Sequence, residues 1–225
     1  CLSCTCGTCR SRRLTMPRPD NPHLRQFLLF VFALIVPCFA LWTVAADAIA
    51  MPVVGLADMI LKAWFPGVVE GLVFQGGDVY LMTLFGDADG RPVPMEQSEF
   101  QLGYLVNPGI LSYSLPFYTT LHFATRQQDY LSSYIIGVLL LYPLILLGLV
   151  TLCMKDMMFH LGPLFMEQSG VWLPHGSVIA IAYQLNVLIV PTVAPIAVWA
   201  WQNRESDLFL SVVHDDARAK GRQQA

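Results

Sequence analysis

The chain has 225 residues, of which 55% are hydrophobic and only 13% are charged, and its formal net charge is −3. Soluble domains carry about 25% charged residues, so this composition is typical of an integral membrane protein. Nine of the 13 basic residues lie near the two ends of the chain, and the other four are single and far apart in the sequence. This distribution argues against a nucleic-acid-binding protein, which needs a basic face.

Residues 1–23 are expected to form a short basic cytoplasmic tail. Four cysteines between Cys1 and Cys9 make two CxxC units separated by one residue. Zinc sites of this kind separate the two units by roughly 15–20 residues. We therefore expect residues 1–15 to come from upstream of the native start at Met16, and we exclude them from the functional argument.

The first predicted transmembrane helix covers residues 24–46. Its apolar core is longer than the roughly 7–15 residues of a signal-peptide core, so we expect it to be retained, with its N-terminus in the cytoplasm. Residues 48–66 are predicted to form a separate amphipathic helix on the outer face of the membrane. Asp58 and Lys62, four residues apart, interrupt its apolar character and are spaced to pair along a helix.

Residues 67–106 are predicted to form a small extracytoplasmic β-rich region. Gly76-Gly77 and the segment from Gly86 to Gly90 separate runs of β-forming residues, a pattern that indicates hairpins. About 40 residues cannot bury enough apolar surface to fold alone, so this region should rest on the helices or on a partner.

Residues 107–125 contain no Asp, Glu, Lys or Arg, but include Pro116, His122 and several hydroxyl side chains. If this segment spans, residues 130–153 return outward and residues 176–201 return inward. Ten of the 13 basic residues and both termini then lie in the cytoplasm. If it does not span, the basic C-terminal tail is exported, against the positive-inside tendency.

We therefore predict a mainly α-helical integral membrane protein with about four transmembrane helices. The β-rich insertion lies between the first and second helices. Residues 155–175 form an extracytoplasmic loop, and residues 202–225 form a cytoplasmic tail.

The last predicted helix carries polar residues and prolines within 26 uncharged residues. Hydrocarbon cannot satisfy amide side chains, so these groups should face other helices. They either bond to helices of the same chain or line a groove for a partner helix or substrate peptide, where prolines free backbone carbonyls. The predicted partner-binding residues are Tyr183, Gln184, Asn186, Pro191 and Pro195.

Histidines and cysteines give little support to catalysis. His122, His160 and His175 do not provide two imidazoles at one depth on facing spans, as a bis-histidine haem needs, so no metal or cofactor is expected. Cys38 and Cys153 are candidate nucleophiles near the outer leaflet, where His160 or His175 could approach. No local motif accompanies them, and we do not expect an enzyme.

Four short motifs occur in an order and spacing that resemble a known family. These are RQFLLF from Arg25, PVVGLAD from Pro52, NPGILSYSLP from Asn107, and AYQ from Ala182 followed by LIVP, AP and Trp199. Together they resemble the exosortase H-associated membrane proteins of Gram-negative bacteria, over residues 16–202. None of the motifs is catalytic.

The resemblance implies a small accessory protein that works with an exosortase, a multi-span Cys/Arg/His transpeptidase-like enzyme, or with its sorted substrate. The catalytic blocks of the exosortases themselves have no counterpart here. The expected function is therefore a non-enzymatic accessory protein of a bacterial inner membrane, with the lipid bilayer as its surroundings. The alternatives are a small transporter or channel component, and an intramembrane thiol enzyme using Cys38 or Cys153.

Overall fold

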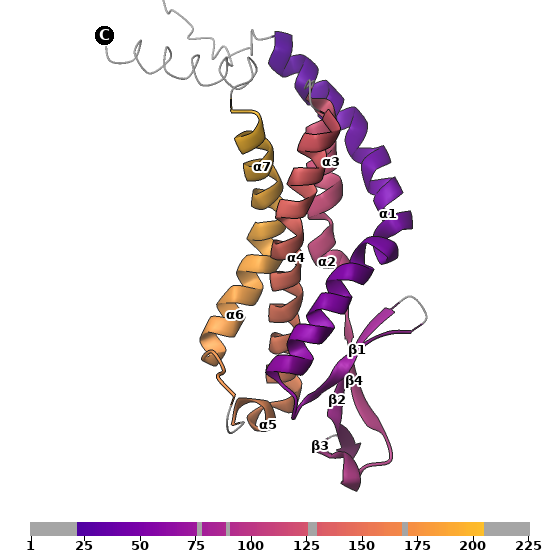
Figure 1. Cartoon of the computed structure of the whole chain (residues 1–225), viewed down its shortest axis with the longest axis vertical. Helices are drawn as coiled ribbons and strands as arrows, with labels where there is room; N and C mark the ends of the chain where they lie inside the picture. The colour runs from indigo at the N-terminus through magenta and orange to yellow at the C-terminus, as the bar shows by residue number, and fades with distance from the viewer. Residues whose placement is uncertain (1–21, 76–77, 89–90, 126–129, 168–170, 205–225) are drawn as a thin grey trace, which may run out of the picture.

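The protein is a long helical bundle with a small sheet at one end (Figure 1). A computed structural model describes residues 22–75, 78–88, 91–125, 130–167 and 171–204. The predicted N-terminal tail, most of the C-terminal tail, the Gly76-Gly77 turn and the connection at 126–129 lie outside these ranges.

A single helix, α1 (Pro22–Trp64), covers both the first predicted span and the segment predicted as a separate amphipathic helix. Its 43 residues extend for about 64 Å at 1.5 Å per residue, roughly twice the thickness of a bilayer core. Pro37 and Pro52 lie inside it and lack the amide that would continue the hydrogen-bond ladder, and α1 is bent (Figure 1).

The second half of α1 buries one face at helical spacing. Val54, Ala57 and Leu61 lie three or four residues apart and are at most 2% exposed. This face packs into a core that also contains Leu81 of the sheet and Met157 of a later helix. Its apolar side therefore meets protein; a position on the outer membrane face stays a prediction.

The predicted β-rich region forms a four-stranded antiparallel sheet. It consists of β1 (Val69–Gln75), β2 (Asp78–Ala88), β3 (Arg91–Pro94) and β4 (Gln101–Val106), with the 3-10 turn η1 (Met95–Gln97) before β4. Met82 of β2 pairs with Gly71 of β1 and with Gly103 of β4, so β1 and β4 flank β2 on opposite sides.

β2 extends farther than the turn predicted at residues 86–90 implies. The strand continues through Gly86 to Ala88 and pairs with β3, which begins at Arg91. At Gly86 the backbone lies so close to Ser98 that a Cβ would overlap its side chain. Ser98 Oγ also donates to Asp87 O at 2.8 Å. These contacts extend the strand and depend on residues distant in sequence.

Asp58 fastens the sheet to α1. Its Oδ1 accepts from the Leu72 amide at 2.8 Å, and its Oδ2 accepts from Lys62 Nζ at 2.8 Å. The predicted support of the sheet by the helices is therefore present.

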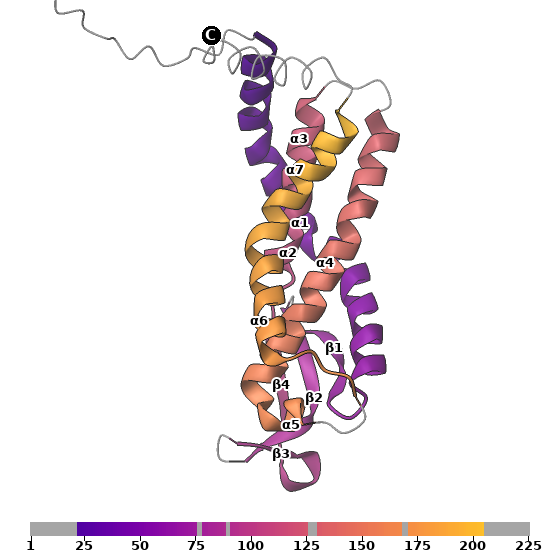
Figure 2. The same cartoon turned by 90° about the vertical axis from the view of Figure 1, so that its left-hand side faces the viewer.

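The segment at 107–125 folds into two short helices, α2 (Gly109–Ser112) and α3 (Ser114–Ala124). Eight residues of α3 are buried, so it lies among the longer helices. Both views show the segment running from the sheet toward the opposite end of the bundle (Figures 1 and 2).

Two further long helices complete the bundle. α4 (Tyr130–Leu161) continues past the predicted end at Cys153 and stops at Gly162, whose φ of 51° favours glycine. The short α5 (Pro163–Met166) follows. The last helix consists of α6 (Gly176–Gln184), a π-helical turn η2 (Leu185–Ile189) and α7 (Val190–Gln202).

Within the described residues, three helices are long and apolar enough to cross a membrane: α1, α4 and the combined α6–η2–α7. Four spans were predicted. The segment at 107–125 does not meet this length criterion, because it is divided at Tyr113 into α2 and α3.

A first prediction concerns the contact between α3 and α4 at Gly137. A Cβ here would overlap the Tyr118 ring, so we expect Gly137→Ala to lower the free energy of unfolding by about 1–3 kcal/mol. Titration with a denaturing detergent would measure the change. Gly55→Ala in α1 is the matched control, since no atom lies within 4 Å of its added methyl. The predicted overlap is refuted if Gly137→Ala and Gly55→Ala have the same free energy of unfolding. It is also refuted if Gly137→Ala destabilises the protein by the same amount when Tyr118 is already replaced by Ala.

A second prediction concerns the link between α1 and the sheet. Asp58→Ala leaves the Leu72 amide without its acceptor, and we expect it to destabilise the chain by about 1–3 kcal/mol. Lys62→Ala removes only a partly exposed ion pair and should change stability by less than about 1 kcal/mol. Hydrogen exchange at Leu72 is the readout. Equal protection of this amide in both variants would contradict the assigned role of Asp58.

Candidate functional site

Three of the five predicted partner-binding residues face the protein's own helices. Asn186 is 4% exposed, and its Nδ2 donates to Ala182 O at 2.9 Å and to Thr151 Oγ1 of α4 at 3.4 Å. Pro191 and Pro195 are also buried. The sequence left two alternatives for these residues: bonding to helices of the same chain, or lining a groove for a partner. At Asn186, Pro191 and Pro195 the structure shows the first.

Pro191 accounts for the local geometry of the last helix. It lacks the amide that would donate to Val187 O in a regular α-helix. Tyr113 Oη, from the junction of α2 and α3, donates to this carbonyl at 3.5 Å. The wide π-turn η2 therefore coincides with an interhelical contact, as is common where a helix ladder is interrupted.

The other two predicted residues lie toward the outside. The Tyr183 ring is half-buried, and Lys155 Nζ lies 5.0 Å from its centroid, a cation–π distance. Gln184 is exposed and shares a helix face with Ile181, Leu185 and Leu188, which are 62%, 46% and 68% exposed. We call these four residues the outward stripe. Partner binding at the five residues stays a prediction.

A polar cluster that the sequence did not predict joins α3, α4 and α7. Tyr118 Oη donates to Gln202 Oε1 at 2.7 Å, and Gln202 Nε2 donates to Ser133 O at 2.8 Å. His122, 1% exposed, bonds through Nε2 to Tyr130 O at 2.9 Å. All of these hydrogen bonds join helices of the same chain, so the cluster holds α3, α4 and α7 together.

Aromatic contacts gather the helix ends opposite the sheet. Trp199 of α7 stacks on Phe27 of α1 with ring centroids 5.2 Å apart, and its Nε1 donates to Thr125 Oγ1 at 2.8 Å. The start of α1, the end of α3 and the end of α7 therefore lie together, as both views show (Figures 1 and 2).

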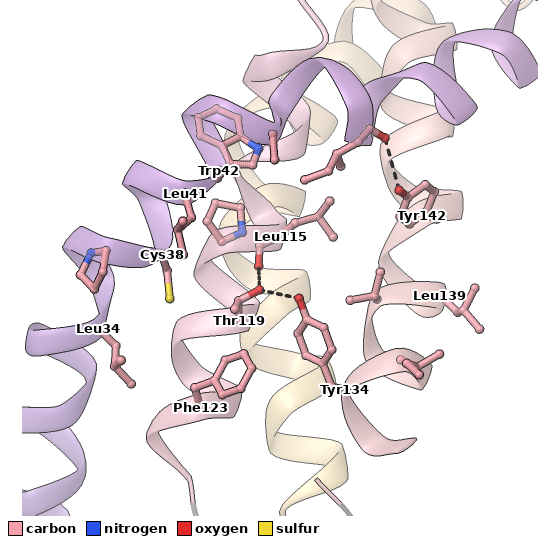
Figure 3. Close-up of a pocket in the computed structure, with 16 residues that line it drawn as sticks. Leu34, Cys38, Leu41, Trp42, Leu115, Thr119, Phe123, Tyr134, Leu139 and Tyr142 are labelled. Carbon is pink, nitrogen blue, oxygen red and sulfur yellow. Dashed lines mark hydrogen bonds between the residues drawn. The ribbon is translucent and has the colours of Figure 1, made fainter. Parts of the chain in front are cut away.

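A large apolar cavity lies between α1, α3 and α4. It measures about 730 Å³ and is lined by side chains from Leu34 to Ile49 on α1 and by facing residues of the other two helices. Figure 3 shows Cys38 and Trp42 on one wall, with Thr119 and Tyr134 facing them. Leu41 and Leu139 on its rim are 71% and 63% exposed, so the cavity opens sideways. We call it the lateral groove.

Most polar atoms in the lateral groove are paired. Thr119 Oγ1 donates to Leu115 O at 2.7 Å and lies 3.1 Å from Tyr134 Oη, and Tyr142 Oη donates to Ile49 O at 3.3 Å (Figure 3). Trp42 Nε1 is buried and has no acceptor among the residues that the structure describes. The groove therefore offers hydrocarbon contacts along its length and one unsatisfied donor at Trp42.

A second hollow adjoins the first at Trp42. It measures about 290 Å³ and is lined by residues of α1, of the sheet and of the start of α2, including Asp47, Asp78 and Asn107. Among the described residues, no basic side chain forms an ion pair with either carboxylate. We call it the acidic hollow. It lies at the sheet end of the lateral groove.

Neither cavity could be predicted from the sequence, because the walls come from segments separated by up to about a hundred positions. Nothing in the local sequence of Thr119 or Tyr134 indicates that their side chains face α1. The bend of α1 creates the space, and its direction is not encoded in any local pattern.

The histidines and cysteines make other contacts. His160 stacks on Tyr104 of β4 with centroids 4.4 Å apart, and His175 Nδ1 accepts from the Ser177 amide at 3.4 Å. Cys153 is fully buried, and within the described ranges no hydrogen bond joins Cys38 or Cys153 to a histidine. The described residues also contain no group of three metal-ligating side chains.

The sheet contains one perturbed titratable group. Burial, with a smaller contribution from the Asp87 carboxylate, raises the pKa of Tyr104 above its ordinary value. Tyr104 therefore stays neutral at physiological pH, and its ring serves as the stacking partner of His160.

Comparison with known proteins identifies the family. A family model described as exosortase H-associated membrane protein matches residues 21–206, which is most of the chain. No curated protein and no solved structure shows a significant match. The resemblance carried by the four sequence motifs is thus confirmed, and the chain belongs to the exosortase H-associated membrane proteins.

Proposed function

We propose that this protein is a non-enzymatic accessory protein of an exosortase system in a bacterial inner membrane. It contacts the exosortase, or the substrate that the exosortase sorts, within the membrane. The observation that carries this proposal is the family match over residues 21–206, whose description associates the family with exosortase H.

The outward stripe is the proposed contact surface. Gln184 is exposed on a helix face that otherwise presents Ile181, Leu185 and Leu188. Measured from the end of α7 at Gln202, it lies about 27 Å along the helix, within the roughly 30 Å of a bilayer core. Hydrocarbon offers an amide no hydrogen bond, so a partner helix with a polar group stabilises Gln184 there.

The other predicted residues support this surface from behind. Asn186, Pro191 and Pro195 hold η2 and α7 against the chain's own helices, and Tyr183 flanks the stripe beside Lys155. In this proposal Gln184 makes direct contact, while the buried three fix the direction in which the stripe faces.

We further propose that the chain crosses the membrane four times with both termini in the cytoplasm. The α2–α3 segment runs between the sheet end and the end where α4 begins, and its 16 residues from Gly109 to Ala124 extend about 24 Å. Most basic residues adjoin the end opposite the sheet in sequence, which supports a cytoplasmic location for that end.

Co-purification tests the proposed partner. A tagged full-length chain, extracted from native membranes in mild detergent, should recover an exosortase or its sorted substrate by mass spectrometry. An interhelical hydrogen bond contributes about 0.6–2 kcal/mol, so Gln184→Leu should reduce recovery roughly 3- to 30-fold. Thr192→Val is the matched control, because the exposed Thr192 hydroxyl bonds to Ile189 O within its own helix. Recovery of the chain without either partner, or equal losses in both variants, would count against the proposal.

Cysteine labelling tests the topology. The six native cysteines are replaced by serine, and either Glu96→Cys in η1 or Gln127→Cys in the connection before α4 is added. A membrane-impermeant maleimide should reach position 96 in cells whose outer membrane is opened, and position 127 only after the inner membrane is opened. Labelling of both positions from outside would mean that α2–α3 does not cross.

A further inference from the structure

The dimensions of the lateral groove limit what it can hold. Along α1, the distance from Leu34 to Ile49 is about 22 Å, so a volume of about 730 Å³ corresponds to a mean cross-section of about 33 Å². The groove is wide enough for an extended hydrocarbon chain.

The lining and the opening indicate where that chain comes from. The walls are mainly apolar, and the hydroxyls of Thr119, Tyr134 and Tyr142 are paired within the protein. The exposed rim residues Leu41 and Leu139 place the opening on the side of the bundle, where a membrane protein meets lipid. From Trp42 back to Leu34 the groove runs for about 12 Å along α1, which is most of the roughly 15 Å of one leaflet, so most of an acyl chain that begins at Trp42 can enter.

Trp42 lies at the depth of a lipid headgroup boundary. It is 18 residues, or about 27 Å, from Leu24, where the candidate span of α1 begins, and the bilayer core is roughly 30 Å thick. Tryptophan is enriched at this boundary. Its Nε1 is buried and lacks an acceptor among the described residues, so it can donate to an ester oxygen bound there.

The acidic hollow shares Trp42 with the lateral groove. Asp47 follows Trp42 by five residues on α1, or about 7.5 Å farther from the bilayer core, and Asp78 begins β2. Their carboxylates have no cationic partner within the part of the chain that the structure describes. A positively charged headgroup complements this hollow, whereas an anionic headgroup is repelled.

We propose that the lateral groove and the acidic hollow together bind one phospholipid with an amine headgroup, of the phosphatidylethanolamine type. One acyl chain occupies the lateral groove, the ester region lies at Trp42, and the ammonium group lies beside Asp47 and Asp78. The site is separate from the outward stripe and does not depend on the proposed partner.

Native mass spectrometry of the purified full-length chain tests the site. The chain is incubated with equal amounts of dioleoyl-phosphatidylethanolamine and dioleoyl-phosphatidylglycerol, and the lipid retained on each molecule is counted. We expect one retained lipid, with phosphatidylethanolamine favoured by roughly fivefold because of the charge complementarity. Retention of no lipid, or equal retention of the two, would overturn the proposal.

Variants separate the acyl and headgroup contributions. Ala45→Phe places a ring inside the lateral groove and should reduce retention of the lipid by about tenfold. Val44→Phe is the control, because Val44 is 87% exposed on the outer side of the same helix. Asp47→Asn with Asp78→Asn should abolish the headgroup preference without abolishing retention, while Glu96→Gln in η1 should leave it intact.

Thermal unfolding of each variant distinguishes site loss from misfolding. If Ala45→Phe unfolds at the temperature of the native chain and retains lipid normally, the acyl site is elsewhere. If it fails to fold, the paired aspartate variants and the competition between the two lipids still decide the proposal. Displacement of the lipid by a hydrophobic helical peptide would assign the lateral groove to a protein partner and overturn the lipid site.

Discussion

Hydrocarbon supplies no hydrogen-bond partner, and this constraint governs where the polar residues of the bundle lie. The α2–α3 segment is rich in polar side chains, and α3 is largely buried, with α1, α4 and α7 around it. Tyr118, His122 and Thr125 all bond to neighbouring helices there. The longer apolar helices therefore enclose the short polar helix and supply partners for its polar groups, as hydrocarbon could not.

The same constraint explains what could be predicted from the sequence. The long uncharged run from Gly176 predicted the last helix, and the β-forming residues around Val79 predicted the sheet. Both elements could be predicted because each depends on local composition. The sequence predicted two elements where the structure has the single helix α1, because Asp58 and Lys62 interrupt the apolar run. In the structure Asp58 accepts hydrogen bonds from Lys62 and from the Leu72 amide. A charge that has a protein partner does not end a helix, and the sequence does not reveal the partner. The ambiguous composition of 107–125 has a similar cause: its side chains face protein on most sides.

The lateral groove follows from the length of α1. Its second half packs tightly on the sheet and α4, with Leu61 and Phe65 fully buried, whereas its first half is largely exposed. Bends associated with Pro37 and Pro52 let one helix serve both environments, and the first half then diverges from α3 and leaves space. The groove cannot be predicted from any single residue. In the sequence Cys38 and Trp42 are typical of a packed helix, and only the structure places Thr119 and Tyr134 opposite them (Figure 3).

The two proposed surfaces lie on different parts of the bundle and suit different kinds of partner. The lateral groove suits a hydrocarbon chain, whereas the outward stripe presents exposed side chains to a helical partner. A lipid chain between α1 and α3 would replace missing protein contacts on the less packed half of α1 and restrict its motion relative to the core. The sheet is bound to α1 through Asp58, so restricting α1 also limits the orientations of the sheet. Occupancy of the groove would in this way stiffen the membrane-embedded half against the extramembrane half without touching the surface proposed for the protein partner.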